Sequence, residues 1–281
     1  MLVNMKEILY NARIQNCAVG SFNIYSYETI KGVLDSAQQQ NVPAILAFGE
    51  KYLKNMDFLS VYSLVKTLSK NIEVPFVLHL DHCSNLKNVY KAIQAGFTSV
   101  MYDGSLLPYE QNVANTLKVV EVAHSCNVSV EAELGSLAIG VSSHEGKLTD
   151  EEVYTDPLQA RDFVKKTGID ALAVSIGTVH GMYNGIPNIR VEILKKIKAK
   201  VNIPLVLHGG SGTPQDILRD CIDNGICKIN VNTEISVFTM DQMMQLLNNG
   251  SKYHLSEVSL MQTNFVKEIV CRYMKLFKQN T

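Results

Sequence analysis

The sequence has little excess charge of either sign and no apolar run long enough to cross a membrane. A spanning helix needs about 18 or more consecutive apolar residues, and no stretch of that length occurs among the 281 residues. The formal net charge of −1 provides no basic surface for nucleic acid. These absences predict a chain that neither spans a membrane nor binds nucleic acid.

Clustered cysteines are also missing. The six cysteines are scattered, with no Cys-x-x-Cys motif, which argues against a disulfide framework and against a cysteine zinc site. The N-terminal segment 1–7 lacks the layout of a signal peptide. We therefore expect a cytoplasmic protein whose thiols are free.

Short apolar segments rich in β-forming residues alternate with longer helical patterns along the chain. The eight candidate strands cover residues 19–22, 44–48, 76–80, 99–102, 129–133, 171–176, 205–207 and 228–231. Each is followed by a candidate helix, over 27–40, 57–69, 85–95, 109–125, 157–166, 189–200, 214–224 and 234–248.

Eight strand–helix units without a linker predict a single (β/α)8 TIM barrel over residues 1–281. The alternative is a doubly wound open sheet. It is disfavoured because no Gly-x-Gly-x-x-Gly motif opens the first helix.

Three segments fall outside the repeat. Residues 258–278 have an amphipathic pattern that predicts an extra C-terminal helix, which caps the barrel or forms a dimer contact. Residues 5–11 predict a helical turn at the bottom of the barrel. Residues 135–154 are polar and rich in Ser, Gly and acids, and their length predicts a mobile active-site loop.

Ionisable and amide side chains gather where the predicted strands end. These carboxyl ends form the active-site face of a (β/α)8 barrel. The residues there are Asn23, Asp81, His82, Asp103, Glu131, Glu133, His180, His208, Asn230, Asn232 and Thr233.

Three of the seven histidines, His82, His180 and His208, follow different strands at this face. Three neutral imidazoles with an open position are a standard catalytic zinc arrangement. A single histidine of this kind is more often an ordinary buried or loop residue, so the metal prediction depends on the three together. His82 can face the same centre as Asp81 only if the chain leaves strand geometry at Asp81. We interpret His79 as a hydrogen-bonded residue of the barrel interior, on the same strand face as Asp81.

The segment 208–212, His-Gly-Gly-Ser-Gly, offers backbone N–H groups that no large side chain obstructs. Loops after strands seven and eight of such barrels commonly bind phosphate. This loop and the segment 230–233 therefore predict a phosphate site, although a glycine-rich segment by itself is usually a plain turn.

Five ordered motifs resemble those of the class II ketose-bisphosphate aldolases, which include the zinc-dependent fructose- and tagatose-bisphosphate aldolases. The resemblance covers nearly the whole chain. The motifs are His-Leu-Asp-His (79–82), Val-Glu-Ala-Glu-Leu-Gly (130–135), Gly-Thr-Val-His-Gly (177–181), Leu-His-Gly-Gly-Ser-Gly (207–212) and Lys-Ile-Asn-Val-Asn-Thr (228–233).

The resemblance implies roles for the matching residues. His82, His180 and His208 match the zinc ligands, and Asp81 matches the residue that exchanges a proton with the carbon 4 hydroxyl of the sugar. The second metal of some members binds at positions that match Asp103 and Glu133. The substrate, through its dihydroxyacetone phosphate part, is expected to contact Asn23, Gly181, Gly209, Gly210, Ser211, Asn230, Val231, Asn232 and Thr233. A monovalent cation (Na⁺ or K⁺) near the phosphate and a homodimer or homotetramer are also implied.

The lid departs from the family pattern. That pattern, Leu-Gly-x-x-Gly-Gly-x-Glu-Asp, supplies the glutamate that acts as acid/base at carbon 3. Here Ala138 and Ile139 replace the double glycine. Glu145 is the candidate for this role, ahead of Glu151 and Glu152, and a solvated loop charge is the alternative for each.

The far end of the substrate site also departs. The family binds the distal phosphate through a serine or threonine after strand two and an Asp-Pro-Arg segment near the C-terminus. Here residues 48–50 read Phe-Gly-Glu, and 251–255 contain no arginine. Lys51 or Lys252 would supply a point charge without the arginine fork.

The resemblance thus implies reversible, zinc-dependent aldol cleavage of fructose or tagatose bisphosphate to dihydroxyacetone phosphate and glyceraldehyde 3-phosphate. Two alternatives stay open. One is a class II aldolase for a ketose 1-phosphate or an acid-ended sugar phosphate, and the other is a non-catalytic sugar-phosphate-binding relative.

Overall fold

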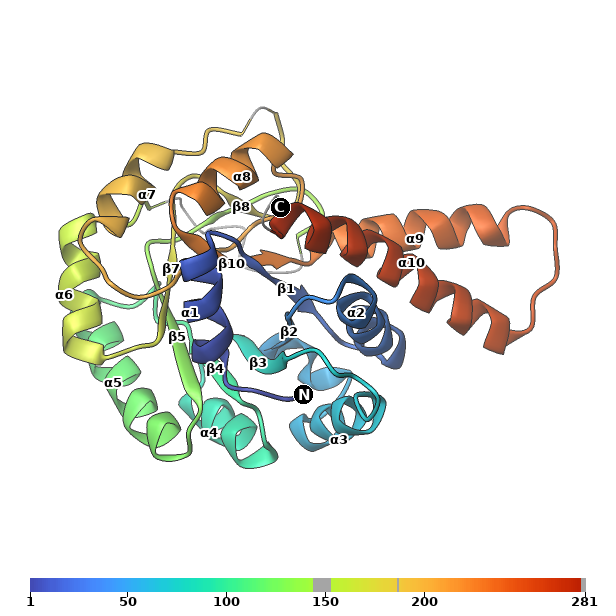
Figure 1. Ribbon diagram of the computed structural model, residues 1–281, viewed down its shortest axis with the longest axis horizontal. Coiled ribbons are helices and arrows are strands. Elements are labelled where there is room, and N and C mark those ends of the chain that lie inside the picture. Colours follow the sequence, from blue (N-terminus) through green and yellow to red (C-terminus); the bar gives the residue numbers. More distant parts are fainter. Residues whose placement is uncertain (144–152, 186, 279–281) are drawn as a thin grey trace.

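Eight parallel strands close into a barrel in the computed structural model, which describes residues 1–143, 153–185 and 187–278. Around the barrel the strands follow the order β1, β10, β9, β7, β5, β4, β3 and β2 (Figure 1). The predicted (β/α)8 barrel is confirmed, and the doubly wound sheet is wrong because the sheet has no open edge. The strands are β1 (Val19–Asn23), β2 (Ala44–Gly49), β3 (Phe76–Cys83), β4 (Ser99–Tyr102), β5 (Ser129–Leu134), β7 (Ala171–Val174), β9 (Leu205–Leu207) and β10 (Ile226–Val231).

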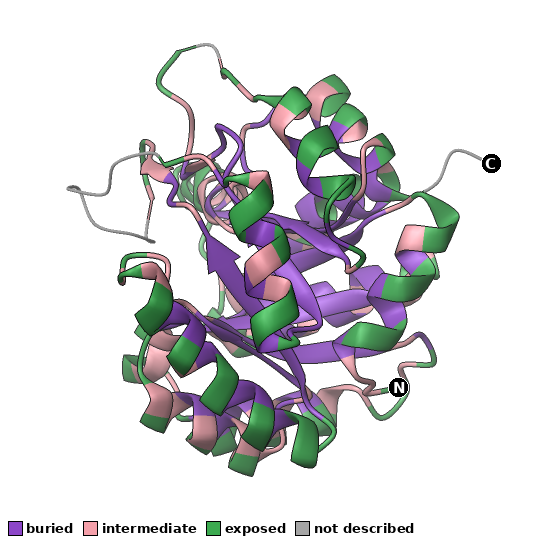
Figure 2. Ribbon diagram, turned by 90° about the vertical axis from the view of Figure 1, so that its left-hand side faces the viewer, coloured by how far each residue is buried: buried purple, intermediate pink, exposed green. Residues whose placement is uncertain are grey.

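Helices connect the strands and cover the outside of the barrel. Figure 2 shows buried strands surrounded by helices that expose their outer faces. The helices lie where the sequence predicts them, within a few residues at each end. They are α2 (Tyr27–Gln40), α3 (Phe58–Leu68), α4 (Leu86–Ala95), α5 (Tyr109–Ser125), α6 (Pro157–Thr167), α7 (Val191–Lys198), α8 (Gln215–Asp223) and α9 (Thr233–Leu247).

The helix ends coincide with capping signals in the sequence. Asn85 accepts a hydrogen bond from the first turn of α4, and Gly96 ends that helix with a left-handed backbone. Asp156 caps α6, Pro157 is its first residue, and Gly168 ends it. Local sequence therefore fixes where these helices begin and end.

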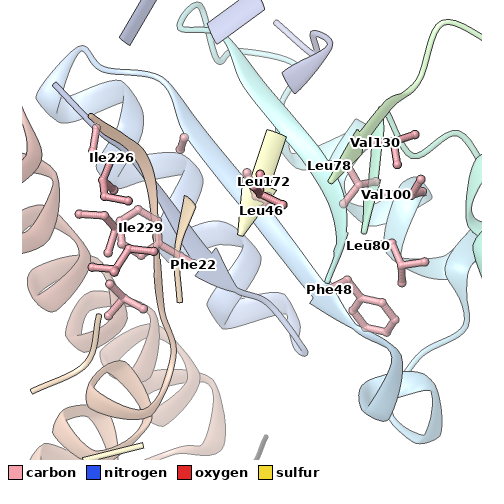
Figure 3. Packing of buried hydrophobic residues seen from close by; sticks show 14 of the residues in the cluster. Phe22, Leu46, Phe48, Leu78, Leu80, Val100, Val130, Leu172, Ile226 and Ile229 are labelled. Carbon is pink, nitrogen blue, oxygen red and sulfur yellow. The ribbon is translucent and has the colours of Figure 1, made fainter. Parts of the chain in front are cut away.

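The main core lies between the strands and the outer helices. Alternate strand residues point outward into it, among them Leu46, Leu78, Val100 and Val130 (Figure 3). Leu46 pairs in register with Leu78, and Val100 with Val130, so the apolar layer continues across neighbouring strands.

Helix α1 (Met5–Gln15) closes the bottom of the barrel. Its buried Met5 and Leu9 pack with Val77 and Ile45 of the barrel interior. This confirms the predicted role of the N-terminal turn and extends it to a full helix. Because the bottom is filled with apolar side chains, a polar site is left to the opposite end.

Two short strands and one long helix refine the predictions. Strands β6 (Ala138–Ile139) and β8 (Val179–His180) pair with each other, so the predicted long loop 135–154 contains a strand. Helix α10 (Leu255–Phe277) starts three residues before the predicted 258–278 helix and packs on α2 and α9. With α9 it forms a hairpin that extends beyond the barrel (Figure 1). Within the described ranges, no helix has the length and apolarity that a membrane span requires.

Candidate active site

The end of β3 places Asp81 and His82 together at the mouth of the barrel. His82 has a φ of 43°, and the pairing of β3 with β4 shifts register between Leu80 and Cys83. A β-bulge of this kind turns the chain out of strand geometry. The chain therefore leaves regular strand geometry at His82, as the sequence analysis required if His82 and Asp81 are to face the same centre. A left-handed backbone at a non-glycine residue is unfavourable and is often found at functional sites.

Three histidine rings converge beside Asp81. The ring centroid of His82 lies 4.9 Å from that of His180 and 4.5 Å from that of His208. One ligand nitrogen from each of the three lies within 4.8 Å of the others. His180 ends the short strand β8, and His208 directly follows β9, so three separate elements supply the cluster.

The hydrogen bonds of two of these rings leave one nitrogen of each available. His82 Nδ1 pairs with Asp103 Oδ2 at 3.0 Å, and His208 Nε2 pairs with Glu131 Oε1 at 2.9 Å. The opposite nitrogens, His82 Nε2 and His208 Nδ1, are buried and make no hydrogen bond. Metal-ligating histidines commonly bond a carboxylate through the nitrogen that faces away from the metal. The orphaned nitrogens and the imidazole donor set therefore fit a transition metal ion.

Carboxylates surround the cluster and favour a cation in it. Burial alone would lower the pKa of His82, but the charges of Asp81 and Asp103 outweigh burial and raise this pKa well above its usual value. Burial likewise opposes ionisation of Asp103, yet its hydrogen bond to His82 holds the pKa of this carboxyl below its usual range. Three carboxylates, those of Asp81, Asp103 and Glu133, thus act on His82 beside the position where a metal ion would bind.

Asp103 and Glu133 lie close enough to His82 to form a second group. One nitrogen of His82 and one oxygen of each carboxylate lie within 4.8 Å of one another. Glu133 Oε2 is buried without a hydrogen bond. The two residues predicted for a second metal are thus brought together beside the histidine cluster.

Asp81 of β3 is held by amide side chains of β1 and β10. Its Oδ2 accepts a hydrogen bond from Asn23 Nδ2 at 3.2 Å, and its Oδ1 accepts one from Asn230 Nδ2 at 3.0 Å. The side chain is 1% exposed. Two amide donors, one to each carboxylate oxygen, fix the orientation of the carboxylate.

A buried ion pair that the sequence analysis missed lies below the histidines. Lys228 Nζ is 2.9 Å from Glu131 Oε2, and both side chains are 0% exposed. Lys228 and His208 both help to lower the pKa of Glu131 against the effect of burial. The available signal was the alternation of Lys228 and Asn230 along β10, because a period of two points both into the barrel.

His79 belongs to the same buried layer. Its Nδ1 lies 2.8 Å from Ser99 Oγ, as expected for a hydrogen-bonded interior residue, while its Nε2 has no hydrogen-bond partner. Burial and the charge of Lys228 lower the pKa of His79 to about 4. A neutral His79 adds no positive charge beneath the site.

The glycine-rich loop after β9 has a backbone that larger residues could not adopt. Gly209 has a φ of 73°, and a Cβ there would lie 2.2 Å from the carbonyl oxygen of Val179. Ser211 Oγ accepts hydrogen bonds from the backbone N–H groups of Asn232 at 3.3 Å and Glu234 at 3.1 Å. The loop is thereby joined to the start of α9, and the two predicted phosphate-binding segments lie side by side.

Asn232 contacts a residue that the sequence analysis did not consider. Its Nδ2 donates to Tyr52 Oη at 3.0 Å, and Tyr52 lies in the short helix η1 (Glu50–Lys54) after β2. Gly181, with a φ of 107°, follows His180 directly. Most predicted site residues thus gather at one end of the barrel, whereas Glu145, Glu151 and Glu152 lie outside the described residues.

A pocket of about 630 Å³ opens at this end of the barrel. Its lining includes Asp81, His82, Asp103, Glu133 and His180. It extends to residues at and after the ends of β2, β3 and β4, where the lining residues are Gly49, Glu50, Lys51, Ser84, Ser105, Leu106 and Leu107.

The closed barrel, with three histidines and an aspartate at its carboxyl end, defines a (β/α)8 protein with a candidate metal site. The family model described as "Fructose-bisphosphate aldolase class-II" matches residues 3–281. The chain therefore belongs to the class II fructose-bisphosphate aldolase family, a family of lyases.

Individual relatives agree with this assignment. The chain is 41% identical to "Fructose-bisphosphate aldolase" of Staphylococcus aureus (strain Mu50 / ATCC 700699) over 256 residues, which cover 90% of this chain and 88% of that protein. It is also 41% identical to "Probable fructose-bisphosphate aldolase" of Bacillus subtilis (strain 168), with coverages of 88% and 86%.

Solved structures show the same fold. The YdjI aldolase from Escherichia coli K12 matches with a TM-score of 0.87 and 31% identity, covering 99% of this chain and 97% of that one. A putative fructose-1,6-bisphosphate aldolase from Coccidioides immitis matches with a TM-score of 0.89 and 26% identity, with coverages of 98% and 96%.

Proposed function

We propose that this protein is a zinc-dependent aldolase that reversibly cleaves a ketose 1,6-bisphosphate, either fructose or tagatose bisphosphate. The products are dihydroxyacetone phosphate and glyceraldehyde 3-phosphate. The observation that carries this proposal is the convergence of His82, His180 and His208 beside Asp81, with a buried ring nitrogen of His82 and one of His208 making no hydrogen bond.

The three histidines would hold the zinc ion. When bound, zinc supplies a Lewis acid that stabilises the negative charge developing on the substrate as the carbon–carbon bond breaks. The carboxylates of Asp103 and Glu131 orient two of the rings through their hydrogen bonds. A lysine that forms a Schiff base is not required for this chemistry, and the buried Lys228 serves instead as the partner of Glu131.

Asp81 would move the proton of the carbon 4 hydroxyl. In cleavage it accepts that proton as the carbon–carbon bond breaks, and in synthesis it returns the proton to the new alkoxide. Asn23 and Asn230 hold both carboxylate oxygens, so the proton acceptor is oriented before the substrate arrives. Glu145 stays the predicted acid/base at carbon 3.

The loop 209–212 and the segment 230–233 would bind the phosphate of dihydroxyacetone phosphate. The segment 230–233 leads into the start of α9, where the helix dipole favours an anion. Gly181 joins them from the segment after β8, and a monovalent cation near the phosphate and a second metal at Asp103 and Glu133 stay predictions.

A substrate with a different far end is the second candidate. Glu50 occupies that part of the pocket, accepting hydrogen bonds from Ser84 N–H at 3.3 Å and from Asn88 Nδ2 at 2.7 Å. Lys51 is the only lysine or arginine among the described lining residues, and Leu106 contributes an apolar edge. This lining favours a ketose 1-phosphate or a singly charged acid end over a dianionic phosphate.

The helical hairpin offers a surface for association between copies of the chain. Met240, Met244 and Leu247 lie on one exposed face of α9, where the hairpin extends beyond the barrel. We infer a homodimer or homotetramer that covers this face, and light scattering on the purified protein measures its mass.

Coupled detection of dihydroxyacetone phosphate tests the activity. The panel contains fructose 1,6-bisphosphate, tagatose 1,6-bisphosphate and fructose 1-phosphate, assayed with zinc-loaded protein. Release from either bisphosphate at the highest kcat/KM supports the main proposal, while a preference for the monophosphate supports the second candidate. Asp81→Asn should lose about 10²–10⁴-fold in kcat while keeping its zinc. No release from any ketose phosphate, with zinc bound, would favour a non-catalytic binding protein.

A further inference from the structure

The C-terminal helix α10 meets the glycine-rich loop at the carboxylate of Glu234. Glu234, the second residue of α9, accepts a hydrogen bond from the backbone N–H of Gly212 at 2.8 Å through its Oε2. The same oxygen accepts a hydrogen bond from the hydroxyl of Tyr273 in α10. Three segments that are distant in sequence thus meet at one atom.

The geometry of the loop depends on this carboxylate. Ser211 bonds the first N–H groups of α9, as described above, while Glu234 of α9 bonds the next residue of the loop, Gly212. Gly212 has a φ of 70°, a conformation that glycine samples among many others. A hydrogen bond that selects this conformation reduces the freedom of the segment between Gly209 and Gly212.

Packing provides less support on the same side of the loop. A pocket of about 430 Å³ lies there, lined by Gly212, Glu234, Tyr273 and Leu218, among others. A segment with open space beside it gains few van der Waals contacts. The hydrogen bonds therefore determine its position more than they would in a packed core.

Tyr273 is itself well fixed. Tyr273 is 7% exposed. The centroid of its ring lies 5.6 Å from the centroid of the Phe277 ring. Burial and the charge of Glu234 raise the pKa of the phenol, so it stays a hydrogen-bond donor. An anchored donor limits where the Glu234 carboxylate can lie.

We propose that Tyr273 is a positioning residue for substrate phosphate: it holds Glu234, and Glu234 holds the loop 209–212 in its anion-binding conformation. This inference rests on the proposed function of that loop. Under this proposal, the last turns of the C-terminal helix influence the affinity for substrate. Tyr273 itself does not line the pocket that contains Asp81 and His82.

Tyr273→Phe removes only the hydroxyl and tests the proposal in the zinc-loaded protein. The KM for the ketose phosphate and the inhibition constant of inorganic phosphate should each rise on the order of fivefold, with kcat changed less than about twofold. In a Glu234→Ala background, the same substitution should have no further effect, because the interaction it removes is already lost.

Tyr109→Phe is the matched control. The Tyr109 hydroxyl donates to Asp162 Oδ2 at 2.6 Å, between α5 and α6, and does not line the site. It should leave both constants unchanged. Equal effects of the two substitutions would overturn the proposal and indicate a general loss of stability.

Amide hydrogen exchange adds a readout that is independent of catalysis. Peptides covering 205–218 should exchange faster in Tyr273→Phe than in the unsubstituted protein, without ligand. Unchanged exchange with unchanged KM would overturn the inference while leaving the proposed aldolase intact. An unsubstituted protein that binds no phosphate and cleaves no ketose phosphate would overturn both.

Discussion

At the scale of single residues, the buried pair of Lys228 and Glu131 shows how charge is accommodated beneath the site. Glu131 Oε1 lies 3.1 Å from Lys228 Nζ and 2.9 Å from His208 Nε2, so one carboxylate oxygen contacts both residues. Burying an ion pair is costly, and removing one partner leaves an uncompensated charge. The pair supports a site that needs His208 in one fixed orientation.

Replacing Lys228 should therefore cost far more than replacing an exposed lysine. We expect Lys228→Met to lower the free energy of unfolding by about 3–5 kcal/mol. Lys166, which pairs with Asp162 at 2.9 Å at the surface, is the control, and Lys166→Met should cost much less, because an exposed ion pair contributes little to stability. Urea denaturation followed by circular dichroism suits a chain without tryptophan. Adding Glu131→Gln to Lys228→Met should restore part of the loss, and similar losses for both single variants would contradict this account.

At the scale of elements, the loop after β9 and the start of α9 form one unit. The backbone N–H of Glu234 donates to Ser211 Oγ, and the Glu234 carboxylate accepts a hydrogen bond from the backbone N–H of Gly212. The same loop needs glycine at position 209, because Gly209 approaches the carbonyl of Val179 in the segment that carries His180. The phosphate segment and the metal segment are thus placed by direct backbone contact.

Two glycines with similar φ values distinguish the effect of a close contact from the effect of a left-handed backbone. Gly209 and Gly168 have φ values of 73° and 69°, but of the two only Gly168 has open space where a Cβ would lie. Gly168→Ala should cost about 1–2 kcal/mol of stability for the left-handed backbone and leave activity unchanged. Gly209→Ala should in addition lower kcat/KM on the order of 10²-fold, because the clash displaces the loop. Steady-state kinetics and thermal melts measure both, and a fully active Gly209→Ala would refute the role of the close contact.

Local sequence predicts elements well in this protein and predicts their ends almost as well. Each strand is a short apolar segment, and caps such as Asn85 and Asp156 mark the helix starts. The two-residue strands β6 and β8 escaped prediction because so short a segment carries no periodic pattern. Their pairing depends on residues about forty positions apart, which no local rule can supply.

At the scale of the whole molecule, the barrel brings His82, His180 and His208 from three elements into one cluster. A barrel closed at the bottom by α1 leaves this polar face at the opposite end. A metal bound there would join β3, β8 and the segment after β9, so its binding should stabilise the folded chain as a whole.

Metal removal should therefore affect both activity and stability. Exhaustive treatment with a chelator should abolish cleavage and lower the melting temperature, since a ligand present at about 1,000 times its Kd contributes about 4 kcal/mol. Zinc should restore both. His82→Ala should prevent this recovery, whereas His124→Ala should not, because His124 pairs with Asp170 away from the cluster. Full activity in protein shown by elemental analysis to lack divalent metal would contradict the proposal.

Local patterns were enough to predict the strands, the helices and the set of polar residues at the strand ends, because periodicity, caps and chain order are properties of neighbouring residues. Three other features arise only when the chain has folded. The left-handed turn at His82 depends on the pairing of β3 with β4. The Lys228–Glu131 pair depends on burial from both sides of the barrel, and the contact of Tyr273 with Glu234 depends on how α10 packs. Each joins residues far apart in the chain, and the free energy of such contacts exists only once the barrel has closed.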